Sequence, residues 1–150
     1  MTPKKPPRLK VFFDANVLFA AVWNPDGIAG HTLRHPKLVH AHVSELALDE
    51  ARRNLTAKKP EALPRLAELL TRMTVVPTAA TGPDVPLPEK DQRIFWSALA
   101  HAADYLITGD KDFSPLVDSP MAQGIKVLSP RQFYEEIAQL GRLKGKGAPP

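Results

Sequence analysis

The chain has 150 residues, of which 43% are hydrophobic and 24% charged, the size and composition of one globular domain. It contains no cysteine, which excludes disulfide bonds, thiolate nucleophiles and sulfur-ligated zinc or iron. The apolar run Val11 to Phe13 is too short for a signal-peptide core, and no stretch approaches the ~20 apolar residues that cross a bilayer. We therefore expect a cytoplasmic protein with no membrane segment.

The formal net charge of +4 is concentrated at the two ends of the chain. Seven basic residues lie there without any acidic one: Lys4, Lys5, Arg8, Lys10, Arg142, Lys144 and Lys146. The remaining chain carries 13 basic and 16 acidic side chains and is net acidic. We predict a domain at 9–140 between flexible basic tails at 1–8 and 141–150. Such tails either attract phosphate backbones or simply keep a protein in solution.

In chain order, short strand-like runs alternate with longer helix-like ones, which predicts an α/β domain with a central parallel sheet flanked by helices. The first half is predicted to contain a buried strand at 9–13, a helix at 17–23, a Pro/Gly turn at 25–30, a short helix and a strand at 38–43. Ser44 is placed to cap a helix that runs to about 57. A helix at 61–73 and a short strand at 74–76 follow.

The second half begins with a loop at 77–88, because this stretch holds four prolines and a glycine. An amphipathic helix at 89–103, a strand at 104–108, a tight turn at 109–112 and a strand at 125–128 are predicted next. The closing helix has a clear start signal: Ser129 as N-cap, Pro130 at the first helical position and Gln132 as capping-box partner.

Two aspartates lie where apolar strands end: Asp14 directly after the first strand, and Asp110 after the strand at 104–108 and Gly109. Ligands of parallel sheets bind outside the carboxyl ends of the strands, where the strand order reverses, so both side chains are expected at one crevice. Asp91 lies in the first turn of its helix, which opens toward the same edge of the sheet. Three acidic side chains are thus predicted to converge.

A fourth acid is expected from the helix capped by Ser44, which carries Glu45, Asp49 and Glu50. At ~100° per residue, Glu50 borders the apolar stripe of this helix, whereas Asp49 and Glu45 have the pattern of ordinary solvent charges. Glu50 is therefore the favoured candidate to reach into the crevice.

Clustered carboxylates repel one another unless a cation neutralises them. With no cysteine and no histidine pair at metal-ligand spacing, an all-oxygen set suits Mg²⁺ or Mn²⁺. Such ions activate water and stabilise the charge that develops on a phosphodiester under attack.

Each acid also has a structural role that would explain it without a metal. Asp14 could cap the following helix, Asp91 could favour the dipole of its own helix, and Asp110 and Asp112 could form a turn. Glu50 could pair with Arg53 or Asn54 on the surface.

Four segments together resemble the PIN domain, the fold of many small ribonucleases, including VapC-type toxins of toxin-antitoxin pairs. The resemblance spans 9 to about 138. Its segments are Phe13-Asp14-Ala15-Asn16-Val17-Leu18, Leu48-Asp49-Glu50-Ala51, Glu89-Lys90-Asp91-Gln92 with Ala98 to Ala103, and Asp104 to Phe113, of which the last is the most specific.

The resemblance implies a three-layer α/β/α fold and a catalytic, metal-binding quartet of Asp14, Glu50, Asp91 and Asp110. It implies Asp112 as an auxiliary metal-binding acid, and Asn16 and Thr108 as polar residues that orient the site. It further implies an endoribonuclease that cuts RNA with metal-activated water and, for a toxin, an antitoxin protein as partner. The stretches 23–36 and 77–88 match no motif and are expected to set substrate choice.

Two other functions remain open: an aspartate-nucleophile phosphatase, and a PIN-like interaction module without turnover. Asn16 stands where such a phosphatase would need a second aspartate, and the intact quartet argues against the module. Apolar helix faces are compatible with a homodimer. Trp23 and Trp96 lie in helical patterns, which favours core or interface positions over base-stacking platforms.

Overall fold

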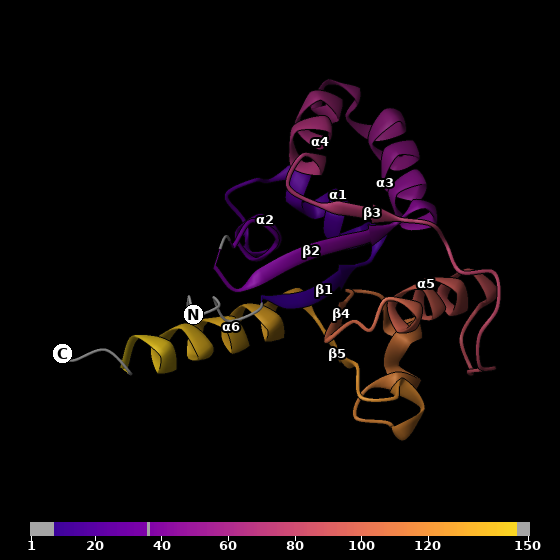
Figure 1. Ribbon diagram of the computed structural model, residues 1–150. Helices are drawn as coiled ribbons and strands as arrows, with labels where there is room; N and C mark the ends of the chain where they lie inside the picture. The colour runs from indigo at the N-terminus through magenta and orange to yellow at the C-terminus, as the bar shows by residue number, and fades with distance from the viewer. Residues whose placement is uncertain (1–7, 36, 147–150) are drawn as a thin grey trace, which may run out of the picture.

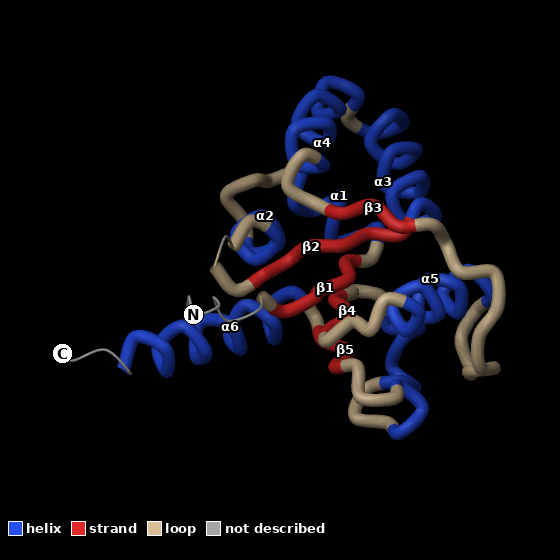
Figure 2. The backbone as a smooth tube through the Cα atoms, viewed as in Figure 1, coloured by secondary structure: helices blue, strands red, loops and turns tan. Residues whose placement is uncertain are grey.

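The computed structural model describes residues 8–35 and 37–146, and its centre is a parallel sheet of five strands (Figures 1 and 2). In chain order the strands are β1 (Leu9–Phe13), β2 (Val39–Ser44), β3 (Thr74–Val76), β4 (Tyr105–Ile107) and β5 (Lys126–Leu128). They lie side by side in the order β3-β2-β1-β4-β5. The order reverses between β1 and β4, so a ligand crevice is expected outside the carboxyl ends of these two strands.

Helices cover both faces of the sheet. They are α1 (Ala15–Trp23), α2 (Ile28–Leu33), α3 (Glu45–Lys58), α4 (Leu63–Leu70), α5 (Glu89–Ala100) and α6 (Pro130–Lys146), with short 3₁₀ turns η1 (Pro60–Ala62), η2 (Lys111–Leu116) and η3 (Pro120–Ala122). Because parallel crossovers are right-handed, α1 to α4 lie on one face and α5, η2 and η3 on the other (Figure 1). The predicted three-layer α/β/α arrangement is confirmed.

The last helix returns to the face that carries α1. Phe133 of α6 packs on Tyr105 and on Phe13, with ring centroids 5.0 and 6.3 Å apart. All three side chains are buried. Within the described residues, no helix combines the length and the apolar character that crossing a membrane requires.

The register of the sheet places the ends of β1 and β4 together. Phe13 pairs with Ile107, and the parallel pairing continues for one more step, since the amide of Asp14 donates to the carbonyl of Ile107 (2.9 Å). Asp14 and Thr108 therefore leave the sheet as neighbours. Strands this apolar must be buried on both faces, which leaves their ends as the place for polar side chains.

Most predicted elements are present, with shifted ends. The first α-helix begins at Ala15 rather than at 17 because Asp14 caps it. The helix predicted to reach 103 ends at Ala100, since Ala102 turns into the left-handed region (φ 52°). The capping box of α6 forms as predicted: Ser129 N donates to Gln132 Oε1 (2.9 Å) and Gln132 N to Ser129 Oγ (3.2 Å).

Further differences concern two turns, one helix and one domain boundary. The turn predicted at 25–30 contains the first residues of α2, and the turn predicted at 109–112 runs into η2. The helix predicted at 61–73 divides into η1 and α4. The helix α6 continues to Lys146, so the domain boundary predicted at 140 falls inside it, while 1–7 and 147–150 of the predicted tails lie outside the described residues.

Candidate active site

Asp14 is held at the end of β1 by three hydrogen bonds. Its Oδ1 accepts from the amide of Ala15 (2.7 Å), and its Oδ2 accepts from Thr108 Oγ1 (2.7 Å) and Asn16 Nδ2 (3.1 Å). Only 3% of the residue is exposed. Burial raises the pKa of Asp14, while the bonds from Thr108 and Ala15 oppose that rise. Asp14 therefore both caps α1 and contributes its carboxylate to the crevice.

Thr108 and Asn16 tie the end of β1 to the loop after β4. Thr108 Oγ1 donates to Asp14 and accepts from the amide of Asp110 (3.0 Å). Asn16 Oδ1 accepts from the amide of Gly109 (2.9 Å), while its Nδ2 donates to Asp14. These two polar side chains therefore fix the relative position of the two strand ends, which is the orienting geometry implied for them by the resemblance.

Asp110 and Asp112 lie at the start of η2. Asp110 Oδ1 accepts from the amide of Asp112 (2.9 Å), so the turn-forming role weighed for Asp110 is also present. Each of Asp91, Asp110 and Asp112 offers a carboxylate oxygen within 4.8 Å of those of the other two. The structure thus brings the start of α5 to the same place as the loop after β4.

Asp91 is the acid whose charge is least compensated. It is 2% exposed, and its Oδ1 is the buried side-chain oxygen or nitrogen without a hydrogen-bond partner in the described part of the chain. Burial raises its pKa to about 6, and the negative charges of Asp14 and Asp110 act in the same direction. A buried, unpartnered carboxylate is unfavourable by several kcal/mol in most settings, so a cation beside it would be stabilising.

Glu50 reaches the same region from α3. Its Oε1 accepts from Lys90 Nζ of α5 (2.6 Å), whereas Asp49 faces solvent and pairs with Arg53 (3.4 Å). Burial alone would lower the pKa of Lys90, but its bond to Glu50 and the charges of Glu50, Asp91 and Asp14 raise it. The position of Glu50 beside the apolar stripe of α3, which favoured it over Asp49, agrees with this placement. The alternative surface pair of Glu50 with Arg53 is not formed, since Arg53 pairs with Asp49.

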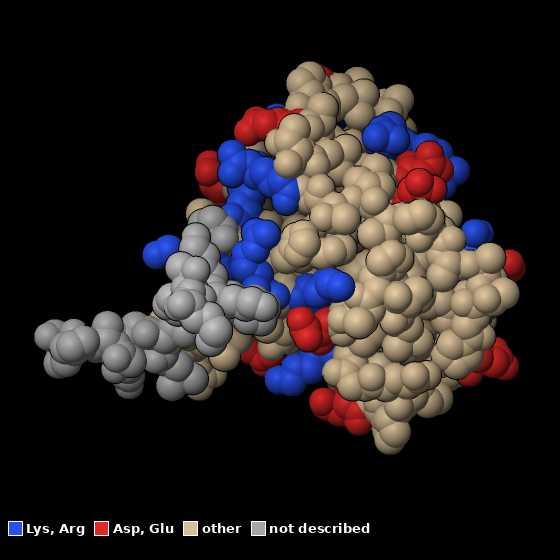
Figure 3. Space-filling view, viewed as in Figure 1, with Lys and Arg blue, Asp and Glu red and all other residues tan. Residues whose placement is uncertain are grey.

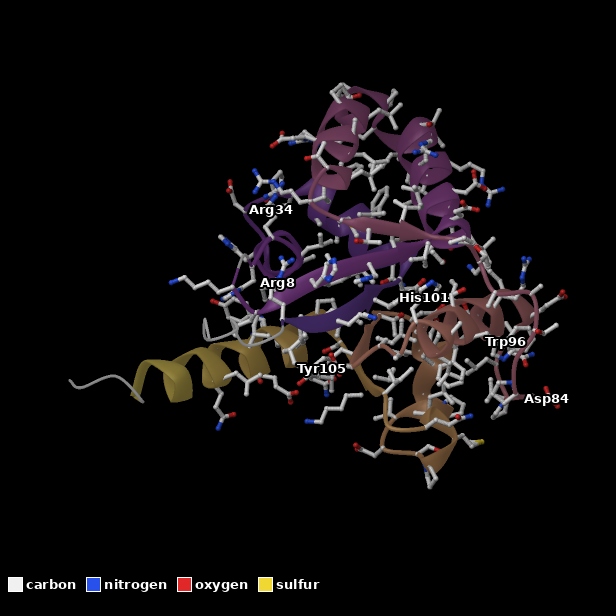
Figure 4. All side chains as sticks on the ribbon, viewed as in Figure 1. Arg8, Arg34, Asp84, Trp96, His101 and Tyr105 are labelled. Atoms are coloured by element: carbon white, nitrogen blue, oxygen red, sulfur yellow. The ribbon has the colours of Figure 1, made fainter. Side chains whose placement is uncertain are left out.

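The proline-rich loop at 77–88 is fastened to α5 and so fixes the position of Asp91. Gln92 Nε2 donates to Leu87 O (3.2 Å) and its Oε1 accepts from the amide of Val85 (3.3 Å). Trp96 Nε1 donates to Pro83 O (2.7 Å), and Figure 4 shows Trp96 directed at this loop. Gly82 lies so close that a Cβ there would come within 2.3 Å of the Trp96 ring.

A cavity of about 220 Å³ lies between the ends of these elements. It is lined by Asp14, Ala15, Asn16, Phe19, Glu50, Asn54, Lys58, Lys90 and Asp110. Asp110 belongs both to this cavity and to the triad with Asp91 and Asp112. The chemistry of the donor set, all carboxylate with one oxygen unpartnered, fits a hard divalent cation such as Mg²⁺ or Mn²⁺.

Some lining side chains were given no part in the site by the sequence: Phe19, Lys58 and Lys90 had no predicted role, and Asn54 was considered only as a surface partner of Glu50. Sequence signals existed for some of them. Lys90 stands beside Asp91 in the first turn of α5. On α3, Glu50, Asn54 and Lys58 are spaced four residues apart, which places these three side chains on one face of the helix. What the sequence alone did not show is that this face lines the cavity.

A scan against protein-family models and a search of curated proteins found no match to this chain. Among solved structures it resembles VapBC2 from Rickettsia felis bound to a DNA fragment from their promoter, with a TM-score of 0.60 and 16% identity over 81% of this chain and 98% of that one. It also resembles VapBC-1 from nontypeable Haemophilus influenzae, with a TM-score of 0.56 and 16% identity over 82% and 99%. A third is the PIN domain endonuclease Utp24, with a TM-score of 0.50 and 16% identity over 84% and 88%.

Taken with the strand order and the layers, these likenesses define the fold as that of a PIN domain. More particularly, this PIN-like fold is shared with structures of VapBC proteins, as the sequence resemblance predicted.

Proposed function

We propose that this protein is a Mg²⁺- or Mn²⁺-dependent endoribonuclease of the PIN type that hydrolyses RNA phosphodiester bonds. The observation that carries the proposal is the unpartnered Oδ1 of buried Asp91 beside Asp110 and Asp112. A fold that only needed stability would not collect several carboxylates around a buried carboxylate with an unpartnered oxygen, because their mutual repulsion is unfavourable.

The residues that would hold the ion are Asp14, Glu50, Asp91 and Asp110, with Asp112 as an auxiliary acid. When bound, a divalent ion activates water and stabilises the charge that develops on the phosphodiester. The chain's own groups orient the site: Thr108 and Asn16 hold Asp14 at the cavity by hydrogen bonds, and the backbone amide of Asp110 donates to the same threonine. Lys90 lies where it can contact a phosphate oxygen beside Glu50.

The VapBC likenesses support a second part of the proposal, namely that this enzyme is the toxin of a toxin-antitoxin pair, with an antitoxin protein as partner. Such an enzyme would act in the cytoplasm, where its RNA substrate is found. The homodimer expected from apolar helix faces stays a prediction.

The phosphatase alternative is disfavoured at position 16. Such an enzyme would need a second aspartate there, whereas this chain carries Asn16, whose amide is bound to Asp14 and to the backbone of Gly109. The interaction-module alternative does not explain why buried Asp91 has an oxygen without a hydrogen-bond partner.

The test is cleavage of a mixed RNA pool by purified protein with Mg²⁺, with Mn²⁺ or with EDTA. Asp14→Asn and Asp110→Asn are the inactivating variants, and Asp49→Asn is the matched control because Asp49 is an exposed acid paired with Arg53. The proposal expects metal-dependent cleavage by wild type and by Asp49→Asn only. Equal cleavage by all four proteins would identify a contaminating nuclease, and stable phosphate labelling of Asp14 would favour the phosphatase.

A further inference from the structure

The acidic cavity extends between α1 and α3, and we call this part of it the groove. On α1, Ala15 and Phe19 line the cavity and Trp23 lies one further turn along. On α3, Glu50, Asn54 and Lys58 line it at the same four-residue steps. Both helices start at the carboxyl edge of the sheet and pack against each other. The row of side chains on α1 therefore runs alongside the row on α3 for about 12 Å.

Two aromatic rings and two cations lie together at the end of the groove: Phe19 and Lys58 line it, and Trp23 and Lys59 lie next to them. The rings of Phe19 and Trp23 lie 5.4 Å apart at an interplanar angle of 30°. Lys58 Nζ is 5.7 Å from the Phe19 centroid, and Lys59 Nζ is 4.5 Å from the Trp23 centroid. Trp23 is 43% exposed, so of the core or interface position expected for this residue the core position is excluded. The groove is acidic at one end and aromatic and basic at the other.

Resting on the nuclease proposal, we propose that this aromatic-basic end, formed by Phe19, Trp23, Lys58 and Lys59, binds the single-stranded nucleotides next to the scissile phosphate of the RNA. Aromatic faces stack on bases of any identity, and lysines contact the backbone phosphates between them. A single strand is required because only unpaired bases present their faces to a side chain.

Position distinguishes these lysines from other basic groups of the surface. Figure 3 shows basic side chains gathered near α2, and Figure 4 places Arg8 and Arg34 there. Arg8 precedes β1 and Arg34 precedes β2, so both lie toward the amino ends of the strands, away from the carboxylates. Lys58 instead lines the same cavity as Asp14 and Glu50, which makes the groove continuous with the candidate active site.

The first experiment measures binding without cleavage. Fluorescein-labelled oligouridylate is titrated with protein in EDTA at low salt, and anisotropy is recorded. Trp23→Ala is expected to weaken binding about tenfold, and the double variant Lys58→Ala/Lys59→Ala to weaken it about as much with a smaller salt dependence. Lys37→Ala and Tyr134→Ala are the matched controls, exposed and outside the groove, and are expected to bind like wild type.

The second experiment uses the two tryptophans of the chain as reporters. Stacking of a base on Trp23 should quench indole fluorescence when oligouridylate is added. The quench should persist in Trp96→Phe and disappear in Trp23→Phe, which keeps an aromatic ring in place. In cleavage assays, Trp23→Ala should raise KM more than it lowers kcat, because stacking is present before the chemical step.

The outcomes separate this inference from the nuclease proposal. If wild type cleaves RNA but Trp23→Ala and the lysine variants bind and cleave like wild type, the groove is not an RNA site and a protein contact is left as its use. A wild-type protein that does not bind oligouridylate also overturns the inference. If nothing is cleaved but Trp23-dependent binding persists, the RNA groove stands and the nuclease proposal falls.

Discussion

The two sides of the candidate active site are built differently. On the strand side, Asp14 is buried with both oxygens hydrogen-bonded, and Thr108 and Asn16 connect it to the loop after β4. On the helix side, buried Asp91 has an oxygen without a partner, and Glu50 is balanced only by Lys90. The strand side is therefore rigid before any ligand binds, while the helix side holds unbalanced charge that a cation would neutralise.

This difference indicates a division of roles. A network in which every donor and acceptor is satisfied holds its members in place, whereas an unsatisfied buried charge is tolerated where a ligand will complete it. Substitutions on the strand side should therefore act on geometry and turnover, and those on the helix side on cation affinity and on stability without the cation.

The largest effect is expected for Asp14→Asn. The amide keeps the shape but removes one negative charge and turns an acceptor into a donor facing Thr108 and Asn16. Metal-dependent RNA cleavage should fall at least about a hundredfold, as when one group of a charge-stabilising set is removed. Cleavage rate under saturating Mg²⁺ is the measurement, with Asp49→Asn as control. A variant that cleaves as fast as the control would contradict the role of Asp14.

Asp91→Asn should change stability in a pH-dependent way. The pKa of Asp91 is raised from 3.8 to about 6 by burial and neighbouring acids, so between these values the folded state binds more protons than the unfolded state. Metal-free wild type should therefore lose stability as pH rises through this window and regain none above it. At pH 7 the asparagine variant should be more stable than wild type by ~2 kcal/mol.

Urea unfolding in EDTA from pH 4 to 8 checks this expectation. The gap between the two proteins should close toward pH 4, where the carboxyl group is protonated in both states. Addition of Mg²⁺ should stabilise wild type but not Asp91→Asn, because only a ligand that binds the folded state raises stability. A constant gap across the pH range would show that Asp91 does not titrate as described.

Thr108→Val tests the clamp on the strand side. The substitution keeps the volume but removes the donor to Asp14 and the acceptor for the amide of Asp110. We expect a loss of about 1 kcal/mol in the free energy of unfolding and roughly tenfold slower cleavage. Thr56→Val, at an exposed threonine that bonds Arg52 O, is the matched control and should leave cleavage unchanged. Unchanged cleavage in both variants would remove Thr108 from the orienting role.

The smallest effect is expected for Lys90→Gln. The lysine neutralises part of the charge of Glu50, so its removal should raise the affinity for Mn²⁺ a few-fold while Glu50 remains. Calorimetric titration of metal into protein measures this. Lys126→Gln breaks a comparable pair with Glu136 (3.2 Å) elsewhere and should have no effect on the affinity. A lower Mn²⁺ affinity in Lys90→Gln would mean that Lys90 supports the metal site rather than competing with the ion.

Local sequence determined much of this protein. Continuous apolar runs predicted the buried strands. The acid that follows each run, Asp14 at once and Asp110 after Thr108 and Gly109, had to lie near the carboxyl edge whatever the rest of the chain did. Ser129 and Gln132 predicted the start of α6 because a capping box is closed within four residues. Such features depend on neighbours in the chain, so they can be read without knowing the fold.

Tertiary structure alone decided the rest. The pairing of Glu50 with Lys90 joins residues forty positions apart, and it depends on α3 and α5 meeting across the end of the sheet. The same holds for the groove, since the pattern around Trp23 equally suited a core helix, and only the packing of α1 on α3 leaves its ring exposed beside Lys59. Strand order sets which helix ends meet, and strand order is a property of the whole chain.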